Sequence, residues 1–305
     1  MAGRTSWACA TDSVVNQSTT MLDNSRPKAT LVSNSKEFTM RIIALILTFL
    51  AAPLNAHELW LEPLNYQISA ESNLEAAIVN GQEFAGTRLP YLPQRYKHFT
   101  VFGSGQNALV GGRPGDTPAL NMSVLGDGLH VVVYQSTPSV IGYEEWAKFQ
   151  KFVDHKDLGD ARAISEANGW PLEGFSEVYT RFSKTLIAVG SADGADLRAG
   201  LLTELVALNN PYVDDLSEGL RVQLFYGQGV RANEQVELFA KAADGTVTIT
   251  LHRTDAEGIA TLPVQAGYAY MVDAVVLREA SAELAAERDA IWETLWANLT
   301  FAVPE

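Results

Sequence analysis

The segment from Met40 to Ala56 constrains this chain more than any other, because it decides which residues are available to fold. It begins with Met40 and the basic Arg41, continues as the apolar run Ile42–Ala52, and closes at the small residue Ala56. This three-part layout is typical of a secretory signal peptide. The apolar run is shorter than the ~20 residues of a membrane-spanning helix, which favours cleavage over a permanent anchor. We therefore expect a signal peptide over 40–56 and an exported, periplasmic chain that folds from His57 onward.

The segment ahead of the signal, residues 1–39, is rich in Ser, Thr and Asn and has no apolar period. A composition of this kind cannot bury enough apolar surface to fold alone. We expect 1–39 to be a disordered extension, unless Met40 is the true start of the protein. The only cysteine of the chain, Cys9, lies in this segment. The exported part is therefore expected to contain neither disulfide bonds nor a cysteine-ligated zinc site.

The charge of the chain excludes some partners. Its 36 acidic residues outnumber the 22 basic ones and give a net charge of −14. Binding to nucleic acid or to anionic lipid draws on basic surface, which this balance does not offer. We expect no nucleic-acid partner and no membrane span after signal cleavage. Because 47% of the residues are hydrophobic, the chain can bury substantial cores.

The apolar pattern after His57 predicts strands, then helices, then strands. Turn signals such as Asn80-Gly81 separate short strand-like runs up to about Ser136. Between 141 and 198 the apolar residues Phe175, Val178, Phe182, Leu186 and Val189 fall at helical spacing. We predict a mainly β fold of two immunoglobulin-like or transthyretin-like β-sandwich modules, 57–140 and 199–305, with a helical insert at 141–198. The strands expected include Leu74–Val79, Phe99–Phe102, Leu129–Tyr134, Leu201–Leu208, Leu220–Phe225, Gln235–Phe239, Thr246–Leu251, Gly258–Leu262, Ala269–Leu277 and Trp296–Val303.

Five short motifs occur in order along the exported chain. They are His57–Pro63, Gly128–Tyr134, Arg181–Leu186, Thr254–Gly258 and Trp292–Phe301. Together they resemble an exported, largely uncharacterised bacterial family whose name associates it with nickel and cobalt uptake. The C-terminal part also resembles transthyretin-like or carboxypeptidase-regulatory modules. The resemblance implies handling of a transition metal by a soluble or peripheral component, with a membrane transporter component as a partner.

His57 is the first candidate metal ligand. Cleavage after Ala56 would give it a free α-amine, whose reference pKa of about 7.7–8.0 allows it to lose its proton to a metal near neutral pH. Amine and imidazole would then chelate together and cover half of a tetragonal plane, a geometry that favours Cu(II) or Ni(II). The alternative is that His57 is only a polar residue that the signal peptidase tolerates.

His130 is the candidate for a further ligand. It lies near the start of the expected strand Leu129–Tyr134, the last of the first sandwich, and His57 starts the first strand. In immunoglobulin-like topology these two strands run in parallel, which would bring their starting ends together. The alternative for His130 is a packed strand histidine. Weaker candidates are His98, His155 and His252, together with the oxygen ligands Glu58, Glu62 and Asp127.

No catalytic motif supports an enzyme. The chain has no Gly-x-Ser-x-Gly elbow, no phosphate-binding Gly-x-x-x-x-Gly-Lys loop and no His-Glu-x-x-His helix. We predict an exported protein that binds a transition metal ion, Cu(II), Ni(II) or Co(II), through His57 and His130, as a carrier or accessory of metal uptake or homeostasis. The alternative is a metal-free structural or adhesive module that binds protein or glycan, with tryptophans lining a glycan groove.

Overall fold

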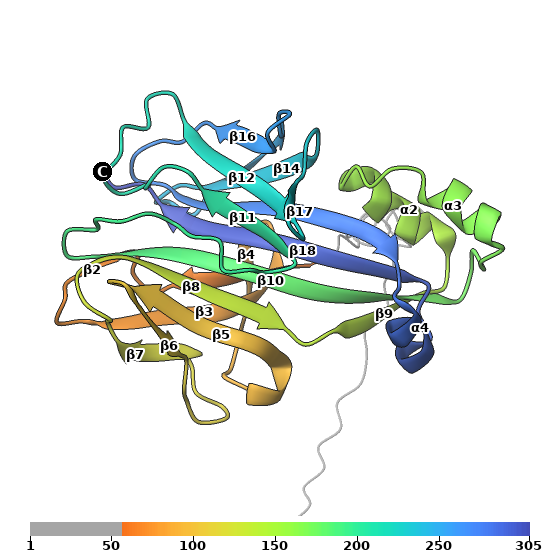
Figure 1. Cartoon of the computed structure of the whole chain (residues 1–305), viewed down its shortest axis with the longest axis horizontal. Coiled ribbons are helices and arrows are strands. Elements are labelled where there is room, and N and C mark those ends of the chain that lie inside the picture. Colours follow the sequence, from red (N-terminus) through yellow and green to blue (C-terminus); the bar gives the residue numbers. More distant parts are fainter. Residues whose placement is uncertain (1–56) are drawn as a thin grey trace, which may run out of the picture. The chain divides into compact units, whose positions relative to one another are not determined.

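A ten-stranded sheet forms the centre of the fold in the computed structural model, which describes residues 57–305. We call it sheet B. Its main path runs through long strands that cross the molecule in Figure 1. In order across the sheet these are β15 (Val247–Arg253), β14 (Gln235–Lys241), β17 (Ala269–Glu279), β18 (Trp292–Ala302), β10 (Phe175–Val189), β8 (Gly128–Ser136), β5 (Tyr96–Gly103) and β6 (Gln106–Leu109), and the short strands β2 (Gln67–Ile68) and β9 (Ser139–Tyr143) also pair with β10.

Sheet B takes strands from both expected sandwich modules. Strand β10 joins the two halves: it pairs in parallel with β18 and antiparallel with β8. The mainly β class is therefore confirmed. The module boundaries at 140 and 199 stay a prediction. Sheet B itself is continuous and contains strands from both sides of these boundaries. The extension 1–39 and the signal segment 40–56 lie outside the described residues.

The prediction of helix over Phe175–Val189 is wrong, because this segment is the strand β10. Nearly all of its residues are buried, since both faces of sheet B are covered. Strand β10 carries apolar and buried polar residues on both of its faces, so its apolar residues do not alternate and can coincide with helical spacing. Phe175, Phe182 and Val189 in fact pack into three different cores.

A small sheet, here sheet A, stands on one face of sheet B. It consists of β1 (Glu58–Pro63), β3 (Asn73–Gln82), β4 (Ala85–Leu89) and β7 (Leu120–Ser123). The outer edge of β1 has no strand partner. Its carbonyls instead accept side-chain hydrogen bonds from sheet B: Arg181 binds the His57 oxygen, Ser183 the Leu59 oxygen at 2.8 Å, and Thr300 the Leu61 oxygen at 2.6 Å.

This edge-on contact divides that face of sheet B into two apolar compartments. One contains Leu61 with Val132 and Ile187, and the other contains Trp60 with Met271. Successive residues of a strand point to opposite faces, so β1 supplies side chains to both compartments. Sheet A therefore separates the two compartments. Polar side chains of β10 and β18 hold its edge against sheet B through the hydrogen bonds described above.

A third sheet, sheet C, covers the other face of sheet B. Its strands are β11 (Thr203–Ala207), β12 (Leu220–Tyr226), β13 (Gly229–Val230) and β16 (Ile259–Leu262). The largest core lies between sheets B and C and includes Leu186, Leu224 and Leu299. This pair of sheets is the β-sandwich part of the fold.

Helices α2 (Trp146–His155) and α3 (Ala161–Asn168) gather at one end of the long strands, on the right of Figure 1. They pack an aromatic core that includes Phe149, Trp292 and Trp296. Both helices fall within the segment 141–198, where helices were predicted. A short helix α4 (Ala282–Arg288) precedes β18, and a 3-10 turn, η1 (Pro93–Arg95), precedes β5. No helix within the described residues has the length and apolarity needed to cross a membrane.

Candidate functional site

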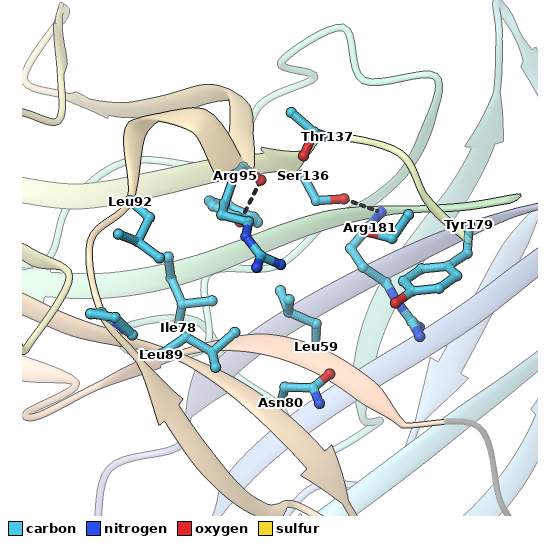
Figure 2. A pocket seen from close by; sticks show the side chains of 13 residues that line it. Leu59, Ile78, Asn80, Leu89, Leu92, Arg95, Ser136, Thr137, Tyr179 and Arg181 are labelled. Carbon is cyan, nitrogen blue, oxygen red and sulfur yellow. Dashed lines mark hydrogen bonds between the residues drawn. The ribbon is translucent and has the colours of Figure 1, made fainter. Parts of the chain in front are cut away.

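The candidate site is a pocket of about 310 Å³ at the seam between sheet A and sheet B. Strands β1, β3 and β4 and the turn η1 form one side, and β8, β9 and β10 form the other. Figure 2 shows the apolar side chains of Leu92, Leu89 and Ile78 at one end and Tyr179 and Arg181 at the other. The lining residues are Leu59, Ile78, Asn80, Leu89, Pro90, Leu92, Arg95, Tyr134, Ser136, Thr137, Ser139, Tyr179 and Arg181.

Arg181 is the most unusual residue of the pocket, because its charged side chain is 94% buried. Its backbone N–H donates to Ser136 Oγ at 3.0 Å, and its Nη2 donates to the carbonyl oxygen of His57. The guanidinium carbon lies 3.8 Å from the centroid of the Trp296 ring. Its Nη1 is buried and has no hydrogen-bond partner within the described part of the chain. A buried nitrogen that carries part of a positive charge and has no partner is costly, so this atom needs an explanation.

The pocket is positively charged. A second guanidinium, that of Arg95, extends toward Leu59 in the middle of the pocket, and that of Arg181 lies next to the Tyr179 ring (Figure 2). Neither arginine forms an ion pair with a carboxylate within residues 57–305. None of the described residues that line the pocket is acidic. The site therefore offers positive charge and hydroxyl groups at one end and an apolar wall at the other.

A buried charge network lies beside the pocket, on the other side of β1. Lys156, just after α2, places its Nζ 2.7 Å from Glu237, 3.0 Å from Asp273 and 3.5 Å from Glu58. All four side chains are less than a tenth exposed. One lysine among three carboxylates leaves a local excess of negative charge. The Arg181 guanidinium is a second positive charge that offsets part of this excess.

Burial sets the protonation of this region. It raises the pKa of Glu58 to about 7, because desolvation outweighs the attraction of Lys156. Burial also lowers the pKa of Arg181, while the charges of Asp273 and Glu58 raise it. At the edge of the network, the hydrogen bond of His155 Nε2 to Glu237 at 3.1 Å raises the pKa of that histidine.

The structure separates the two histidines that the sequence paired. The expected pairing of the first and last strands of the N-terminal module is wrong: β1 pairs with β3, while β8 pairs with β5 and β10. Because β1 turns its free edge toward sheet B, no strand can lie beside that edge. His57 lies next to Arg181, whereas His130 is opposite Ile187, six residues and roughly 20 Å further along β10.

His130 has both ring nitrogens engaged. It is fully buried, Nδ1 lies 3.0 Å from the Gly128 oxygen, and Nε2 accepts the backbone N–H of Leu125 at 3.0 Å. This is the packed strand histidine that the sequence left open as an alternative. In this arrangement no ring lone pair is left for a metal. Burial also lowers the pKa of its imidazole.

His57 is exposed at the mouth of the pocket. Its Nδ1 lies 3.5 Å from Asn80 Nδ2, and its carbonyl is held by Arg181, so both neighbours are pocket residues. The other candidates lie elsewhere: His98 on β5, His155 on Glu237, and His252 beside Thr250. Of the proposed oxygen ligands, Glu62 faces Arg88 and Lys241, and Asp127 binds Ser191.

The described residues do not form a ready-made metal centre. No group of three or more His, Cys, Asp or Glu side chains within residues 57–305 is arranged to hold an ion. The tryptophans considered for a glycan groove are mostly core residues, since Trp60, Trp292 and Trp296 are at most 2% exposed. Metal binding by His57 stays a prediction that depends on its free α-amine.

Sequence reasoning missed Arg181 and Lys156. Arg181 was noted only as the first residue of a motif, Arg181–Leu186, within a segment read as helix. The available signal was a set of charged residues inside otherwise apolar runs, such as Arg181 and Lys184 in β10 and Asp273 in β17. Charges in such places are rarely buried unless they are paired or have a function.

Comparisons with known proteins give a family but no activity. A family model described as "Domain of unknown function (DUF4198)" matches residues 54–278. No curated protein matches this chain. A solved structure titled "Crystal structure of tetra-tandem repeat in extending region of large adhesion protein" is 14% identical over 81% of this chain. This chain spans 49% of that one, and the TM-score is 0.18, which is too low to support a shared fold.

Proposed function

Since this chain belongs to the DUF4198 family, a domain of unknown function, we propose a function from its own pocket. The protein is an exported binding protein, not an enzyme, and its ligand is a small organic carboxylate with an apolar part. The observation that carries this proposal is the buried Nη1 of Arg181, which has no hydrogen-bond partner among residues 57–305 and belongs to a pocket-lining side chain. A ligand carboxylate would supply the missing acceptor.

The chemistry of the lining supports an anionic ligand. Hydrogen bonds between a guanidinium and a carboxylate are among the stronger ones in proteins, and they strengthen further where water is excluded. Because none of the described lining residues is acidic, a ligand ammonium would have no counter-charge there. Leu59, Leu89 and Leu92 offer an apolar wall for the rest of the ligand. The volume lies at the lower end of the roughly 300–1,000 Å³ of small-molecule sites.

Calorimetric titration with matched probes tests the proposal. Hexanoate should bind to the purified full-length protein, whereas hexanol and hexylamine should not. Arg181→Met should weaken hexanoate binding by about tenfold or more, and Arg95→Met by less, because Arg95 is exposed. The exposed Arg113 lies outside the pocket, so Arg113→Met is the matched control.

Folding of the variants needs a separate check. The melting temperature of Arg181→Met and of the more conservative Arg181→Lys should show that each variant is folded before its affinity is compared. Equal binding of hexanol and hexanoate would overturn the proposal. So would unchanged hexanoate affinity in a folded Arg181→Met protein.

A second candidate function is binding of a transition metal at His57, as the sequence predicted. The observation that favours it is the exposed imidazole of His57 at the pocket mouth, where its carbonyl is fixed by Arg181. Cleavage after Ala56 would place an α-amine beside that ring, and the pair could chelate Cu(II), Ni(II) or Co(II). Such a protein would act as a carrier or accessory of metal uptake, with a membrane transporter component as partner.

Processing of the N-terminus makes the metal candidate testable. Protein that starts at His57 should retain about one equivalent of Cu(II) after dialysis, measured by elemental analysis. Protein with His57→Ala, or with an added Met before His57, should not retain Cu(II). A folded His130→Ala protein should retain it. If neither metal nor hexanoate is retained, the alternative of a structural or adhesive module that binds protein or glycan gains support.

A further inference from the structure

The backbone of His57 lies just before β1 and beside the pocket, because the pocket residue Arg181 donates a hydrogen bond to its carbonyl. In antiparallel pairing, the N–H and C=O of one residue point to the same edge of the strand. The carbonyls of His57, Leu59 and Leu61 point toward sheet B, away from β3. The main-chain nitrogen of His57 is therefore on the same edge as the carbonyl that Arg181 holds.

Cleavage would change the charge at this nitrogen. Hydrolysis of the Ala56–His57 amide leaves a carboxylate on Ala56 and an α-amine on His57. With a reference pKa of about 7.7–8.0, a free α-amine is mostly a cation at pH 7. In the uncleaved chain this nitrogen is a neutral amide N–H that is bonded to the preceding residue. Signal cleavage would thus add a positive charge beside Arg181, at the mouth of the pocket.

The groups around this nitrogen favour an anion as its partner. Arg181 and Arg95 are the charged residues that line the pocket, and both are cations. The nearest carboxylate along β1, that of Glu58, is buried on the other side of the strand against Lys156. The charges of Asp273, Glu58 and Glu177 act on Arg181, but none of the described lining residues is a carboxylate that could also balance Arg95 and the added α-amine. A ligand with more than one negative charge would balance these cations.

We propose that the α-amine of His57, freed by signal cleavage, is a ligand-binding group of this pocket and that the preferred ligand is a dicarboxylate. One carboxylate binds Arg181, the second binds the α-amine, and the apolar link between them lies against Leu59. This inference rests on the proposed binding of carboxylates by Arg181. Under this proposal, the full set of ligand-binding groups is present only in the exported protein from which the signal peptide has been removed.

Blocking the amine tests this inference. The exported protein that starts at His57 is compared with the same protein after selective acetylation of its α-amine, at a pH of about 6.5 where lysine side chains react more slowly. The probes are adipate and hexanoate, which share a six-carbon chain and differ by one carboxylate. EDTA in the buffer removes metal ions that would compete for the amine.

The expected result is a loss specific to the second carboxylate. Acetylation should weaken adipate binding by about tenfold and leave hexanoate binding within about twofold, since it removes only the charged hydrogen bond to the second carboxylate. Protein with an added Met before His57 should behave like the acetylated protein. Mass spectrometry of the N-terminal peptide confirms that only the α-amine is modified.

Each other outcome has a distinct meaning. If hexanoate binds and acetylation leaves adipate affinity unchanged, this inference is wrong while the proposed carboxylate site stands. If neither probe binds to the unmodified protein, both are overturned. If the amine effect appears only when EDTA is omitted and Cu(II) is added, the α-amine is a metal ligand and the dicarboxylate assignment is rejected.

Discussion

At the scale of single residues, the buried Lys156 balances the charge of three buried carboxylates. Lys156 is the only cation within 4.0 Å of Glu58, Glu237 and Asp273 in the described part of the chain, apart from His155 on Glu237. Removing one partner of a buried network is strongly destabilising, because the remaining charges stay uncompensated. The network includes Glu58, the β1 residue that follows His57. An intact network therefore also holds the start of β1, beside the pocket, in position.

We expect Lys156→Met to lower the free energy of unfolding by roughly 3–5 kcal/mol. Urea denaturation followed by tryptophan fluorescence measures it. The matched control is Lys151→Met, which removes an exposed lysine from the same helix. Adding Glu237→Gln and Asp273→Asn to Lys156→Met should restore part of the loss. A loss no larger than that of the control would contradict the network.

His130 illustrates a histidine with a packing role. Its ring lies against Gly103 of β5, where an added Cβ would come within 2.4 Å of the ring atom Cδ2. Gly103→Ala should therefore cost about 1–3 kcal/mol of stability through overpacking. In a His130→Ala background the same substitution should cost clearly less, because the ring is gone. A double-mutant cycle measures this coupling, and strictly additive costs would refute the contact.

At the scale of elements, the row of polar side chains under β1 replaces a missing strand. Ser183 and Thr300 donate to the carbonyls of Leu59 and Leu61, which have no backbone partner on that edge. A buried carbonyl without a donor costs roughly 1–3 kcal/mol. These hydroxyls therefore hold sheet A, and with it one wall of the pocket, against sheet B.

We expect Ser183→Ala and Thr300→Val each to lower stability by about 1–3 kcal/mol and to speed hydrogen exchange of the β1 and β3 amides. Ser123→Ala, at an exposed position of β7 in the same sheet, should change neither. Hydrogen–deuterium exchange with mass spectrometry resolves the two strands. Uniform exchange changes across all sheets would show that the effect is global and not a release of sheet A.

The sequence predicted most strands but not how they assemble. Expected runs such as Leu129–Tyr134, Gln235–Phe239 and Ala269–Leu277 lie inside β8, β14 and β17. Their alternation or turn signals are local, so they can be read from the chain. Strand β10 could not be read in this way, because polar and apolar residues occur on both of its buried faces and do not alternate. The edge-on contact of β1 depends on hydroxyls more than 100 residues away, for which no local signal exists.

The same division holds for the candidate site. His57 could be singled out as a candidate because its proposed chemistry follows from a local signal, the end of the expected signal peptide. Arg181 and Arg95 become a site only through the fold, since β10 and η1 meet at the seam beside β1. The prediction that His57 and His130 lie close together was wrong because it assumed the strand order of an immunoglobulin-like sandwich, which this fold does not have.

At the scale of the whole molecule, the buried carboxylate of Glu177 makes stability depend on pH. Glu177 is 2% exposed, and it accepts hydrogen bonds from Tyr143 at 3.0 Å and from Thr294. Burial raises its pKa from 4.5 to about 7, although the two hydrogen bonds oppose that shift. The folded state therefore binds this proton more tightly than the unfolded state does. Its stabilising contribution is fully present below pH 4.5 and is lost as the pH rises through about 7.

We expect the Glu177→Gln variant to lose this pH dependence, because glutamine keeps the shape and cannot ionise. The difference in unfolding free energy between variant and wild type should shift in favour of the variant by up to roughly 3 kcal/mol between about pH 4.5 and pH 7.5. Urea denaturation at intervals of half a pH unit measures it. The exposed Glu173→Gln is the control and should leave the profile unchanged. If Glu177→Gln follows the wild-type profile at every pH, Glu177 is ionised throughout that range, and other groups set the pH dependence.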